Sequence, residues 1–514
     1  MYKKVILLLV IVVFMLSCSK QDAPIDETPP TEPEIPPTET TTLDLNDDGK
    51  LNILILGTSN SINSSSSGFA SDKIAIELQN ILSNDESVTL DVNVVSEDIY
   101  KSKNIEVGLG QAGNVYNFWH YSHSLMQYYY WPEGKTERWE NLANQSTNKW
   151  DYVIMGADPY IVSKVPGYYA LGVNKIASKV LEGGAKPMLL LVWPKDEANT
   201  TSVKNYEEFT YRIAEGAENQ LETIPAGLAW NALAGSKKDT ATEHPTPNGA
   251  YVAAAAIYSQ LSNKSATASA YSYDDEIADT AFSTKTNEEN KEHYTGDHDF
   301  MSPYKNCSIN DATLNYNHTG TSSENGILNG LKWIITQSDR TLVSGGTSPI
   351  NFNYGRANTN FEASKRYKVD PSKFDFSLGF PMQDNGNHGN TSMLYGLDKR
   401  TSDSNNGTDL GTALYMIRNS ELPNARAIPI RTLYAQIKEA IPSQSAYRDD
   451  WHMHGILDRA TGAFMYTLLT GECVLGAEPS DTNSDAWKSW MAQKIGHQTA
   501  YTFMSLKGTS LSCN

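Results

Sequence analysis

The sequence predicts an α/β fold in which a parallel β-sheet carries helices on both faces, followed by a second α/β half. Continuous apolar runs such as Ile53–Leu56 and Pro187–Trp193 are typical of parallel strands that are buried on both faces. Segments with apolar residues at helical spacing alternate with these runs, which is the pattern of a parallel sheet with helical connections. The chain of 514 residues is longer than one hydrophobic core usually serves, so we expect two domains.

The N-terminus has the features of an export signal followed by a tether. Residues 1–18 combine two lysines with the apolar run Val5–Leu16, which is too short for a permanent membrane-spanning helix. The segment Leu16-Ser17-Cys18 resembles a bacterial lipobox, in which cleavage leaves a lipid-bearing cysteine. Residues 19–50 form a tether, most of it rich in Pro, Thr and Glu, that cannot build a core. We therefore expect a lipoprotein attached through Cys18 to the outer membrane or cell surface of a bacterium.

Charge, residue spacing and cysteine count limit which partners, cofactors and disulfide bonds are expected for this chain. The net charge is −19 and the sequence has no clustered basic stripe, so binding to nucleic acid is not expected. Asp44–Gly49 has the acidic spacing that starts a calcium loop but not the acid that ends one, which indicates a charged turn. No Cys/His cluster has metal-site spacing, and we expect neither a metal nor another cofactor. Three cysteines remain besides Cys18, so at most one disulfide bond forms within the chain.

The first domain is expected over residues 51–262. After the strand at Ile53–Leu56, the spacing of apolar residues predicts helices and strands that alternate along the chain. The expected helices are Asp72–Leu82, Tyr168–Leu181, Tyr206–Leu221 and Gly249–Leu261, and the expected strands are Val88–Val95, Trp150–Met155, Pro187–Trp193 and Ile224–Trp230.

Two polar segments of this domain carry residues suited to ester hydrolysis. The first strand breaks at Gly57 and is followed by Ser59 and Ser61, at the end of a strand where α/β sheets bind ligands. A serine becomes a nucleophile when a histidine takes its proton, and His244 stands before the Ala-rich last helix. Both positions are expected at the carboxyl-end rim of the sheet, although far apart in sequence.

These segments resemble the SGNH/GDSL hydrolase superfamily, whose fold is a flavodoxin-like three-layer α/β/α sandwich. Gly57-Thr58-Ser59 stands where the family has its nucleophilic serine, and Gly156-Ala157-Asp158 occupies the third block. His244 is followed by Pro245 and Gly249, as the histidine of the last family block commonly is. The resemblance implies that Ser59 is the nucleophile and His244 the base. It also implies that the amides of Ser59 and Gly113 (or Gly110) bind the oxyanion.

The chain departs from the family pattern at three positions. Thr58 replaces the usual Asp or Asn, and no asparagine follows the third strand. Ala241 stands three residues before His244, where the family has its aspartate. Asp239 and Glu243 are the nearest acids, but Glu243 is adjacent to the histidine and poorly placed to reach its far ring nitrogen, which leaves Asp239 or a distant residue.

Residues 263–514 are expected to form a second α/β domain. Residues 263–300 are polar and irregular and indicate a linker or surface excursion. Helices are expected at Gly326–Thr336 and Thr432–Ala440, and strands at Phe374–Leu378 and Ala427–Ile430.

Two interpretations of this half remain open. Lys373–Phe376 resembles Lys149–Tyr152, and the run starting at Gly462 resembles the run starting at Gly249, which favours a diverged repeat that lacks a convincing Gly-x-Ser start. Alternatively, the chain is one catalytic domain with a large insertion, and Asp449-x-x-His452 supplies its acid and base.

The sequence therefore predicts a serine esterase of the SGNH type. Tyr128–Trp131 is an aromatic run that can stack on sugar rings, and a surface location suggests removal of acyl groups from a polysaccharide or oligosaccharide. The alternative is a non-catalytic glycan-binding lipoprotein on a decayed hydrolase fold, which Ala241 and the missing asparagine favour. No sequence feature identifies the sugar, the acyl group or the oligomeric state.

Overall fold

The computed structural model describes most of both halves of the chain. The described residues are 43–57, 73–98, 106–108, 115–117, 149–156, 159–193, 200–217, 219–235, 246–289, 312–318, 322–347, 376–379, 391–395, 425–445 and 453–506.

The first half contains a parallel sheet of five described strands in the order β2-β1-β5-β6-β7. Each strand pairs with its neighbours in parallel. This is the flavodoxin-like order, as the predicted fold class requires. The strands are β1 (Lys50–Gly57), β2 (Asp91–Asp98), β5 (Tyr152–Gly156), β6 (Lys186–Leu190) and β7 (Glu222–Ile224), and a separate short antiparallel pair is formed by β3 (Glu106–Gly108) and β4 (Val115–Asn117).

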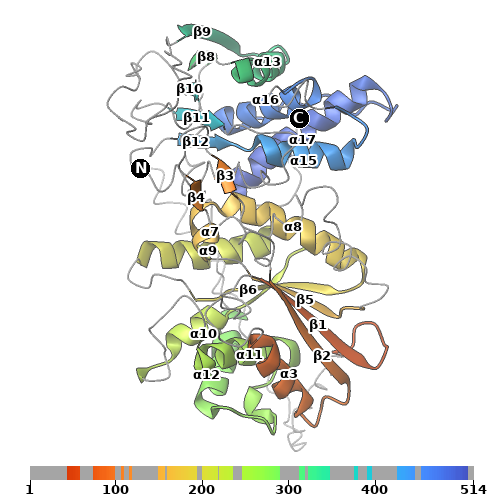
Figure 1. The fold of residues 1–514 in the computed structure, drawn as a ribbon, viewed down its shortest axis with the longest axis vertical. Coiled ribbons are helices and arrows are strands. Elements are labelled where there is room, and N and C mark those ends of the chain that lie inside the picture. Colours follow the sequence, from red (N-terminus) through yellow and green to blue (C-terminus); the bar gives the residue numbers. More distant parts are fainter. Residues whose placement is uncertain are drawn as a thin grey trace, which may run out of the picture. The chain divides into compact units, whose positions relative to one another are not determined.

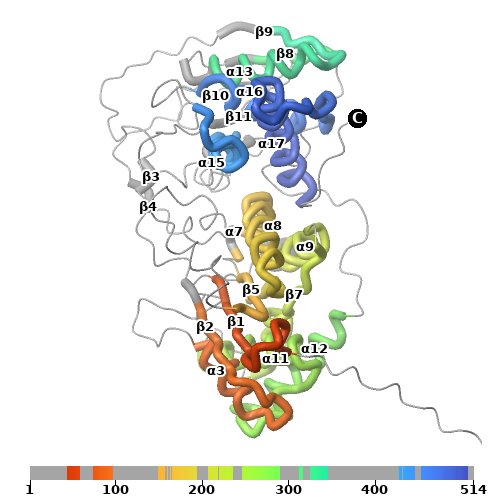
Figure 2. Tube along the Cα trace, turned by 90° about the vertical axis from the view of Figure 1, so that its right-hand side faces the viewer, coloured from red at the N-terminus to blue at the C-terminus, as the bar shows by residue number. Residues whose placement is uncertain are grey.

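Helices cover both faces of this sheet, which gives three layers (Figure 1). One face carries α7 (Pro159–Lys164), α8 (Pro166–Glu182) and α9 (Thr200–Gly216). The other face carries α3 (Lys73–Ser83), α10 (Ala226–Ala232), α11 (Pro247–Ser262) and α12 (Asp275–Glu289). Helices α3 and α11 are far apart in sequence and lie side by side (Figure 2). The predicted three-layer α/β/α fold of the first half is therefore confirmed.

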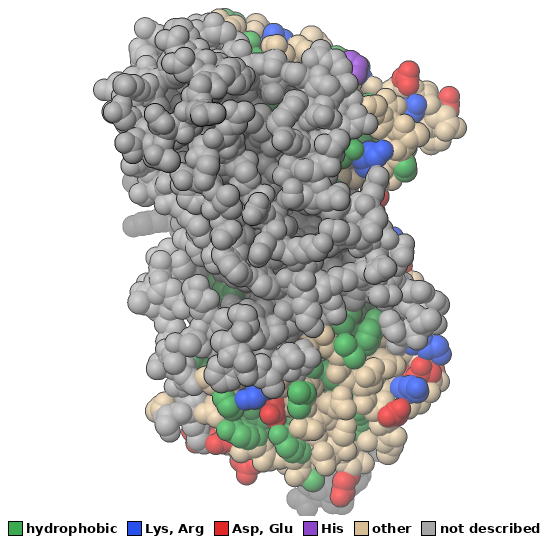
Figure 3. Space-filling view, in the orientation of Figure 1, with side chains coloured by type: hydrophobic (Ala, Val, Ile, Leu, Met, Phe, Trp, Pro, Cys, Tyr) green, Lys and Arg blue, Asp and Glu red, His purple; other side chains and the backbone are tan. Residues whose placement is uncertain are grey.

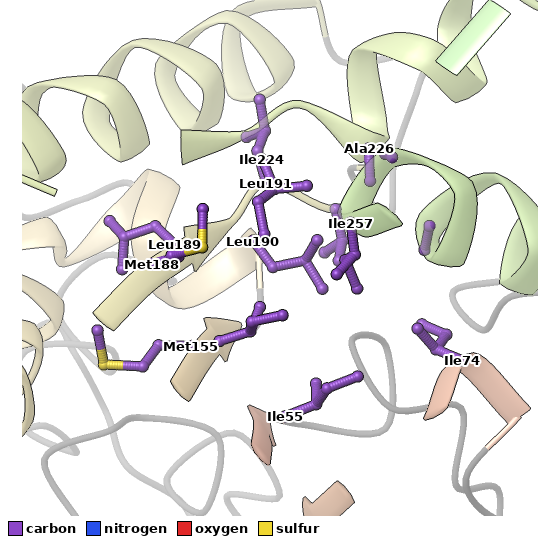
Figure 4. Close-up of a cluster of buried hydrophobic side chains, with 14 of the residues drawn as sticks. Ile55, Ile74, Met155, Met188, Leu189, Leu190, Leu191, Ile224, Ala226 and Ile257 are labelled. Atoms are coloured by element: carbon purple, nitrogen blue, oxygen red, sulfur yellow. The ribbon is translucent and has the colours of Figure 1, made fainter. Parts of the chain in front are cut away.

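The core of the first half lies between the sheet and its helices. Figure 4 shows apolar side chains from strands, such as Ile55 and Met155, together with Ile74 of α3 and Ile257 of α11. All four of these side chains are fully buried. The strands carry apolar side chains on both faces because both faces are covered, as the continuous apolar runs predicted.

Two sequence predictions for the residues around the first sheet are wrong, and one of them concerns residues assigned to the second domain. Ile224–Trp230 was expected as one strand, but the strand ends at Ile224 and helix α10 begins after Pro225, which has no amide hydrogen to continue the ladder. Residues 263–300 were expected as a linker, but Asp275–Glu289 is helix α12, and its Ile277, Ala278 and Ala281 join the first core. The other residues of this helix are mostly polar, so the sequence pattern did not indicate its narrow apolar stripe.

The second half contains a further parallel sheet with the same topology. Its described strands are ordered β9-β8-β10-β11-β12, so the first strand in sequence again lies between the second and the third. This is the arrangement expected of a diverged repeat. The strands are β8 (Thr313–His318), β9 (Thr341–Thr347), β10 (Phe376–Gly379), β11 (Thr391–Tyr395) and β12 (Ala425–Ile428), and the helices are α13 (Ser322–Ile335), α15 (Ile430–Ala440), α16 (Ile456–Thr470) and α17 (Asp485–Ser505).

Helices α13 and α16 make a very close backbone contact. A Cβ atom at Gly462 would lie 2.1 Å from the carbonyl carbon of Gly330, and one at Gly330 would lie 1.7 Å from the carbonyl oxygen of Asp458. Both distances are far inside van der Waals contact, so each position requires glycine. The contact holds α13 tightly against α16.

The surface of the described residues is mixed in charge. On the face shown in Figure 3, acidic and basic side chains are interspersed among apolar and polar ones. Within the described ranges, no helix is both long enough and apolar enough to span a membrane. Cys473 takes part in a disulfide bond, in agreement with the expectation of at most one such bond.

A buried histidine makes the stability of the second half sensitive to acid. His497 is fully buried, its Nε2 lies 2.8 Å from the carbonyl oxygen of Val474 and its Nδ1 lies 2.5 Å from Oγ1 of Thr467. Burial lowers the pKa of His497 to about 4 from an ordinary value of 6.5. The neutral form is favoured in the folded state, so this stabilisation is complete above pH 6.5 and is lost as the pH falls towards 4.

We expect the free energy of unfolding to fall by up to about 3 kcal/mol between pH 7 and pH 4 because of this histidine. Urea unfolding at both pH values measures the change, with His497→Gln as the control, because glutamine can donate to Val474 without titrating. An equal pH dependence in the two proteins would contradict this assignment.

Candidate functional site

The carboxyl ends of β1 and β5 form the edge at which the sequence predicts the site. The strands are neighbours, with Leu56 opposite Met155, and they end at Gly57 and Gly156. After β1 the chain moves outward to β2, then crosses back to β5, so β1 and β5 flank the topological switch point of the sheet. Ligands of flavodoxin-like folds bind at this point. In the sequence, Ser59 follows Gly57, the last residue of β1, by two positions.

The direction of helix α11 relates His244 to the same edge. The hydroxyl of Tyr258, in the last turns of α11, donates to Oδ2 of Asp85 at 2.6 Å, and Gln260 donates to Glu222 at 3.0 Å. Asp85 lies between α3 and β2, and Glu222 begins β7, so both mark the amino-end edge of the sheet. The C-terminal end of α11 lies there, and its N-terminal end is directed to the carboxyl-end edge.

Helix α11 begins at Pro247, two residues before the expected start at Gly249. Thr246 is the N-cap, and its side chain accepts a hydrogen bond from the amide of Gly249 at 3.4 Å. Pro247 occupies the first helical position, where its missing amide hydrogen costs nothing. His244 precedes this cap by two residues. The helix of 16 residues is roughly 24 Å long, enough to cross the sheet from one edge to the other.

The predicted catalytic, oxyanion and lipidation residues lie outside the described residues. These are Cys18, Ser59, Gly110, Gly113, Asp239, His244, Asp449 and His452. Their roles therefore stay predictions, and the described strands and helices supply the frame around them. Among the described residues, no group of three or more His, Cys, Asp or Glu side chains could hold a metal ion.

Asp151 is the most buried carboxyl of the first half, and it lies at the opposite, amino-end edge. It precedes β5 and accepts hydrogen bonds from the amides of Leu45 and Asn52, both at 2.8 Å, and from the side chain of Asn46 at 3.0 Å. Burial raises the pKa of the Asp151 carboxyl above its ordinary value. This carboxyl fixes the chain where it enters β1 and has no part in the predicted site.

The predicted charged turn lies beside this carboxyl. The side chain of Asp44 accepts hydrogen bonds from the amides of Asp48 and Gly49 at 3.3 and 2.8 Å. Asp47 and Gly49 have positive φ angles of 57° and 79°, which close the turn. The interpretation of Asp44–Gly49 as a turn that enters the first strand is confirmed.

The two sheets match in residue register. Ile53 lies opposite Tyr152 across β1 and β5, and Tyr316 lies opposite Phe376 across β8 and β10. Tyr152 and Phe376 are the last residues of the two similar Lys-aromatic-Asp-aromatic segments, Lys149–Tyr152 and Lys373–Phe376. The similarity noticed in the sequence therefore coincides with equivalent positions in the two sheets.

The last two strands of each sheet extend this match. Met188 of β6 lies opposite Ile154 of β5, and Met393 of β11 lies opposite Leu378 of β10. Ile154 and Leu378 each stand two positions after the equivalent residues Tyr152 and Phe376. Strands β7 and β12 both end at an isoleucine that a proline follows. These prolines, Pro225 and Pro429, are each the N-cap of the next helix, with a φ of −84°. The chain therefore contains two α/β units with one strand order and one register.

This register identifies a serine motif that sequence reasoning missed. Ile53 and Tyr316 are equivalent because they lie opposite Tyr152 and Phe376, respectively. Leu51-Asn52 at the start of β1 therefore corresponds to Leu314-Asn315 in β8. Counting on from these pairs without a gap, Gly57-Thr58-Ser59 corresponds to Gly320-Thr321-Ser322. The expectation that the second half lacks a Gly-x-Ser start is wrong. The motif was overlooked because β8 is polar, T-L-N-Y-N-H, and does not have the apolar run of a buried strand.

Helices α11 and α16 of the two units are also equivalent. Tyr258 and Tyr466 stand at the same distance before the residues that end α11 and α16, Asn263 and Gly471, which are both left-handed. Counted back from these two ends, His244 and His452 occupy the same position.

Comparisons with known proteins give structural neighbours only. Searches against protein-family models and curated proteins find no match. The chain is similar to a Bacteroides uniformis protein of the DUF4886 family, with 15% identity over 48% of this chain and 98% of that protein, at a TM-score of 0.33. It is also similar to a Slackia heliotrinireducens protein assigned to the SGNH hydrolases, with 16% identity over 40% and 97%, at a TM-score of 0.29.

A third neighbour is a catalytic mutant of Axe2, an acetylxylan esterase from Geobacillus stearothermophilus. The identity is 12% over 41% of this chain and 95% of that protein, at a TM-score of 0.28. The strand order and the helices on both faces show that the chain has the three-layer α/β/α fold that its resemblance to the SGNH/GDSL hydrolases implies.

Proposed function

We propose that the first half is a serine ester hydrolase of the SGNH type, with Ser59 as nucleophile and His244 as general base. The observation that carries the proposal is the topology. Ser59 follows β1 at the switch point, and helix α11, which His244 precedes, is directed to the same edge of the sheet. A serine and a histidine brought to one edge from distant parts of the chain are what nucleophilic acyl transfer needs.

The reaction would proceed through an acyl-enzyme. His244 takes the hydroxyl proton as Ser59 attacks the ester carbonyl, and the resulting oxyanion accepts hydrogen bonds from backbone amides, for which Ser59 and Gly113 are the candidates. The alcohol leaves with the proton from His244, and water then releases the acyl group as a carboxylic acid. Asp239 is the candidate that orients His244, because Ala241 stands where a closer aspartate would be.

The proposed substrate is an acylated polysaccharide or oligosaccharide at the cell surface. The support is the aromatic run Tyr128–Trp131, which precedes β5 and can stack on sugar rings, together with the export signal and Cys18. A chain that binds glycans without hydrolysing their esters is the second candidate, favoured by Ala241.

Labelling with a fluorophosphonate tests the proposed nucleophile. Such probes form a stable bond with a serine whose hydroxyl is activated by a base and leave ordinary serines unmodified. We expect peptide mass spectrometry of the full chain to find the phosphonyl group on Ser59, and His244→Ala to prevent the labelling. The matched control is Ser61→Ala, which should leave it intact. Labelling of Ser61 would shift the nucleophile, and an unlabelled first half would favour glycan binding without catalysis.

Attachment through Cys18 has its own test. Cys18→Ala should move the protein from the membrane fraction to the soluble fraction of the producing bacterium, because the acyl chains would be lost. Continued sedimentation of this variant with membranes would mean that another element attaches the protein.

A further inference from the structure

The second half of the chain repeats the framework of the first, including the positions that carry its chemistry. Ser322 corresponds to Ser59 through the strand register, and His452 corresponds to His244 through the helix ends. We propose that the second half holds a second ester hydrolase site, with Ser322 as nucleophile and His452 as general base. The class of substrate, a carboxylic ester, rests on the function proposed for the first half.

Contacts among the described residues relate the start of α13 to Met453. Helix α13 begins at Ser322, and Gly326 lies about one turn further along it. A Cβ atom at Gly326 would lie 3.4 Å from both the Cβ and the carbonyl oxygen of Met453. Met453 is the residue next to His452 in the sequence. Met453, which follows His452 in the sequence, therefore packs against the first turns of the helix that begins at Ser322.

The direction of α16 agrees with this placement. Near its C-terminal end the hydroxyl of Tyr466 donates to Oε2 of Glu472 at 2.7 Å, and Arg340 donates to both oxygens of the same carboxylate at 2.6 and 3.1 Å. Arg340 immediately precedes β9, so this cluster marks the amino-end edge of the second sheet. The N-terminal end of α16, which follows His452, is directed to the carboxyl-end edge, where Ser322 follows β8.

The second half also has an acid at the spacing that the first half lacks. Asp449 stands three residues before His452, whereas Ala241 stands three residues before His244. A carboxylate at this spacing can hold the imidazole in the tautomer that accepts the serine proton. In this respect the second half has the more complete set of residues, with Asp449 as the positioning residue.

A buried carboxyl lies beside the same helix turn. Oδ1 of Asp458 is buried without a hydrogen-bond partner among the described residues, and it would lie 2.8 Å from a Cβ atom at Gly326. Burial raises the pKa of Asp458 to about 7. A buried polar atom without a partner is costly to a core, and such groups are commonly retained near functional sites.

The reaction at this site balances as it does in the first half. The oxygen of Ser322 bonds to the ester carbonyl carbon while His452 takes the hydroxyl proton. The bond from that carbon to the alcohol oxygen then breaks, and the alcohol leaves with the proton. Water attacks the acyl-serine, its proton passes through His452 to Ser322, and a carboxylic acid is released.

Fluorophosphonate labelling of the full chain, with peptide mapping, tests the two sites separately. We expect a phosphonyl group on the peptide that contains Ser322, in the wild-type chain and in Ser59→Ala alike. Ser322→Ala and His452→Ala should lose this label, whereas the neighbouring substitutions Ser323→Ala and His454→Ala should retain it. His454 is an exposed residue two positions from His452, so it controls for local disturbance. Circular dichroism and thermal unfolding confirm that each variant is folded.

The role of Asp449 needs a readout that a structural role would not change. Asp449→Asn should slow the labelling of Ser322 and shift its pH profile, while the unfolding temperature stays unchanged. Label on Ser59 with none on Ser322 in a folded chain would overturn the second site and leave the first. Label on Ser322 with none on Ser59 would uphold the second site and refute the function proposed for the first half.

Discussion

In a chain whose second-half serine is removed by Ser322→Ala, the further change His244→Ala is expected to lower the turnover of p-nitrophenyl acetate by roughly 10⁴-fold or more. Without a base, the hydroxyl of Ser59 keeps its proton and is a poor nucleophile. The Ser322→Ala background is needed because a second site would otherwise hide the loss. Steady-state turnover with a saturating ester measures the effect.

The matched variant in this background is His452→Ala, which should leave the turnover of the first site close to that of its parent. The interpretation with one catalytic domain and a large insertion predicts the reverse, because Asp449 and His452 would then serve Ser59. A large loss from His452→Ala with near-normal turnover in His244→Ala would reject the assignment of His244. The described strands form two five-stranded sheets of the same order, which favours the repeat over the insertion.

Gly462→Ala is expected to destabilise the chain by about 3 kcal/mol or more. Its Cβ would meet the carbonyl carbon of Gly330 at 2.1 Å and the amide nitrogen of Leu331 at 2.5 Å. These are backbone atoms of α13, which cannot rotate away as a side chain can. Helices α13 and α16 would have to separate, and the apolar contacts around them would loosen.

Urea unfolding measures this effect, and Gly476→Ala is the control, because a Cβ atom at Gly476 meets nothing within 4 Å. The control should unfold within about 1 kcal/mol of the wild type. Equal stability of the two variants would contradict the close backbone approach of α13 and α16 at Gly330 and Gly462. The Gly462→Ala variant should also lose labelling at Ser322, because Met453, which follows His452 in the sequence, would move away from the start of α13.

The sequence was sufficient for the parts of the fold that are strongly apolar. The strands at Ile53–Leu56, Trp150–Met155 and Pro187–Trp193 were predicted because each is buried on both faces, which leaves a continuous apolar run. The helix expected at Gly249–Leu261 is α11, and it begins two residues earlier than expected, at Pro247, because Thr246 caps it. Local signals of this kind do not depend on distant contacts.

The sequence was insufficient where pairing and packing, rather than composition, define an element. Strand β8 is polar and was not predicted, and only its pairing with β10 shows that Gly320-Thr321-Ser322 follows the first strand of a repeat. Helix α12 was taken for a linker because just a few of its residues, such as Ile277 and Ala281, contact the core. Helix α17 was not predicted. The partners of its buried His497 are Thr467 and Val474, which lie in an earlier part of the chain, so the helix sequence alone does not reveal them.

Turnover of p-nitrophenyl acetate by the Ser322→Ala chain, with and without the additional change Ser59→Ala, tests the central claim most directly. Removal of a serine hydroxyl from a polar turn creates little cavity, so both proteins should unfold at the same temperature. If Ser59 is the nucleophile of the first half, the Ser322→Ala chain hydrolyses the ester and the double variant does not exceed the uncatalysed rate. Equal turnover in the two folded proteins would contradict the assignment of Ser59 and, with it, the proposed function of the first half.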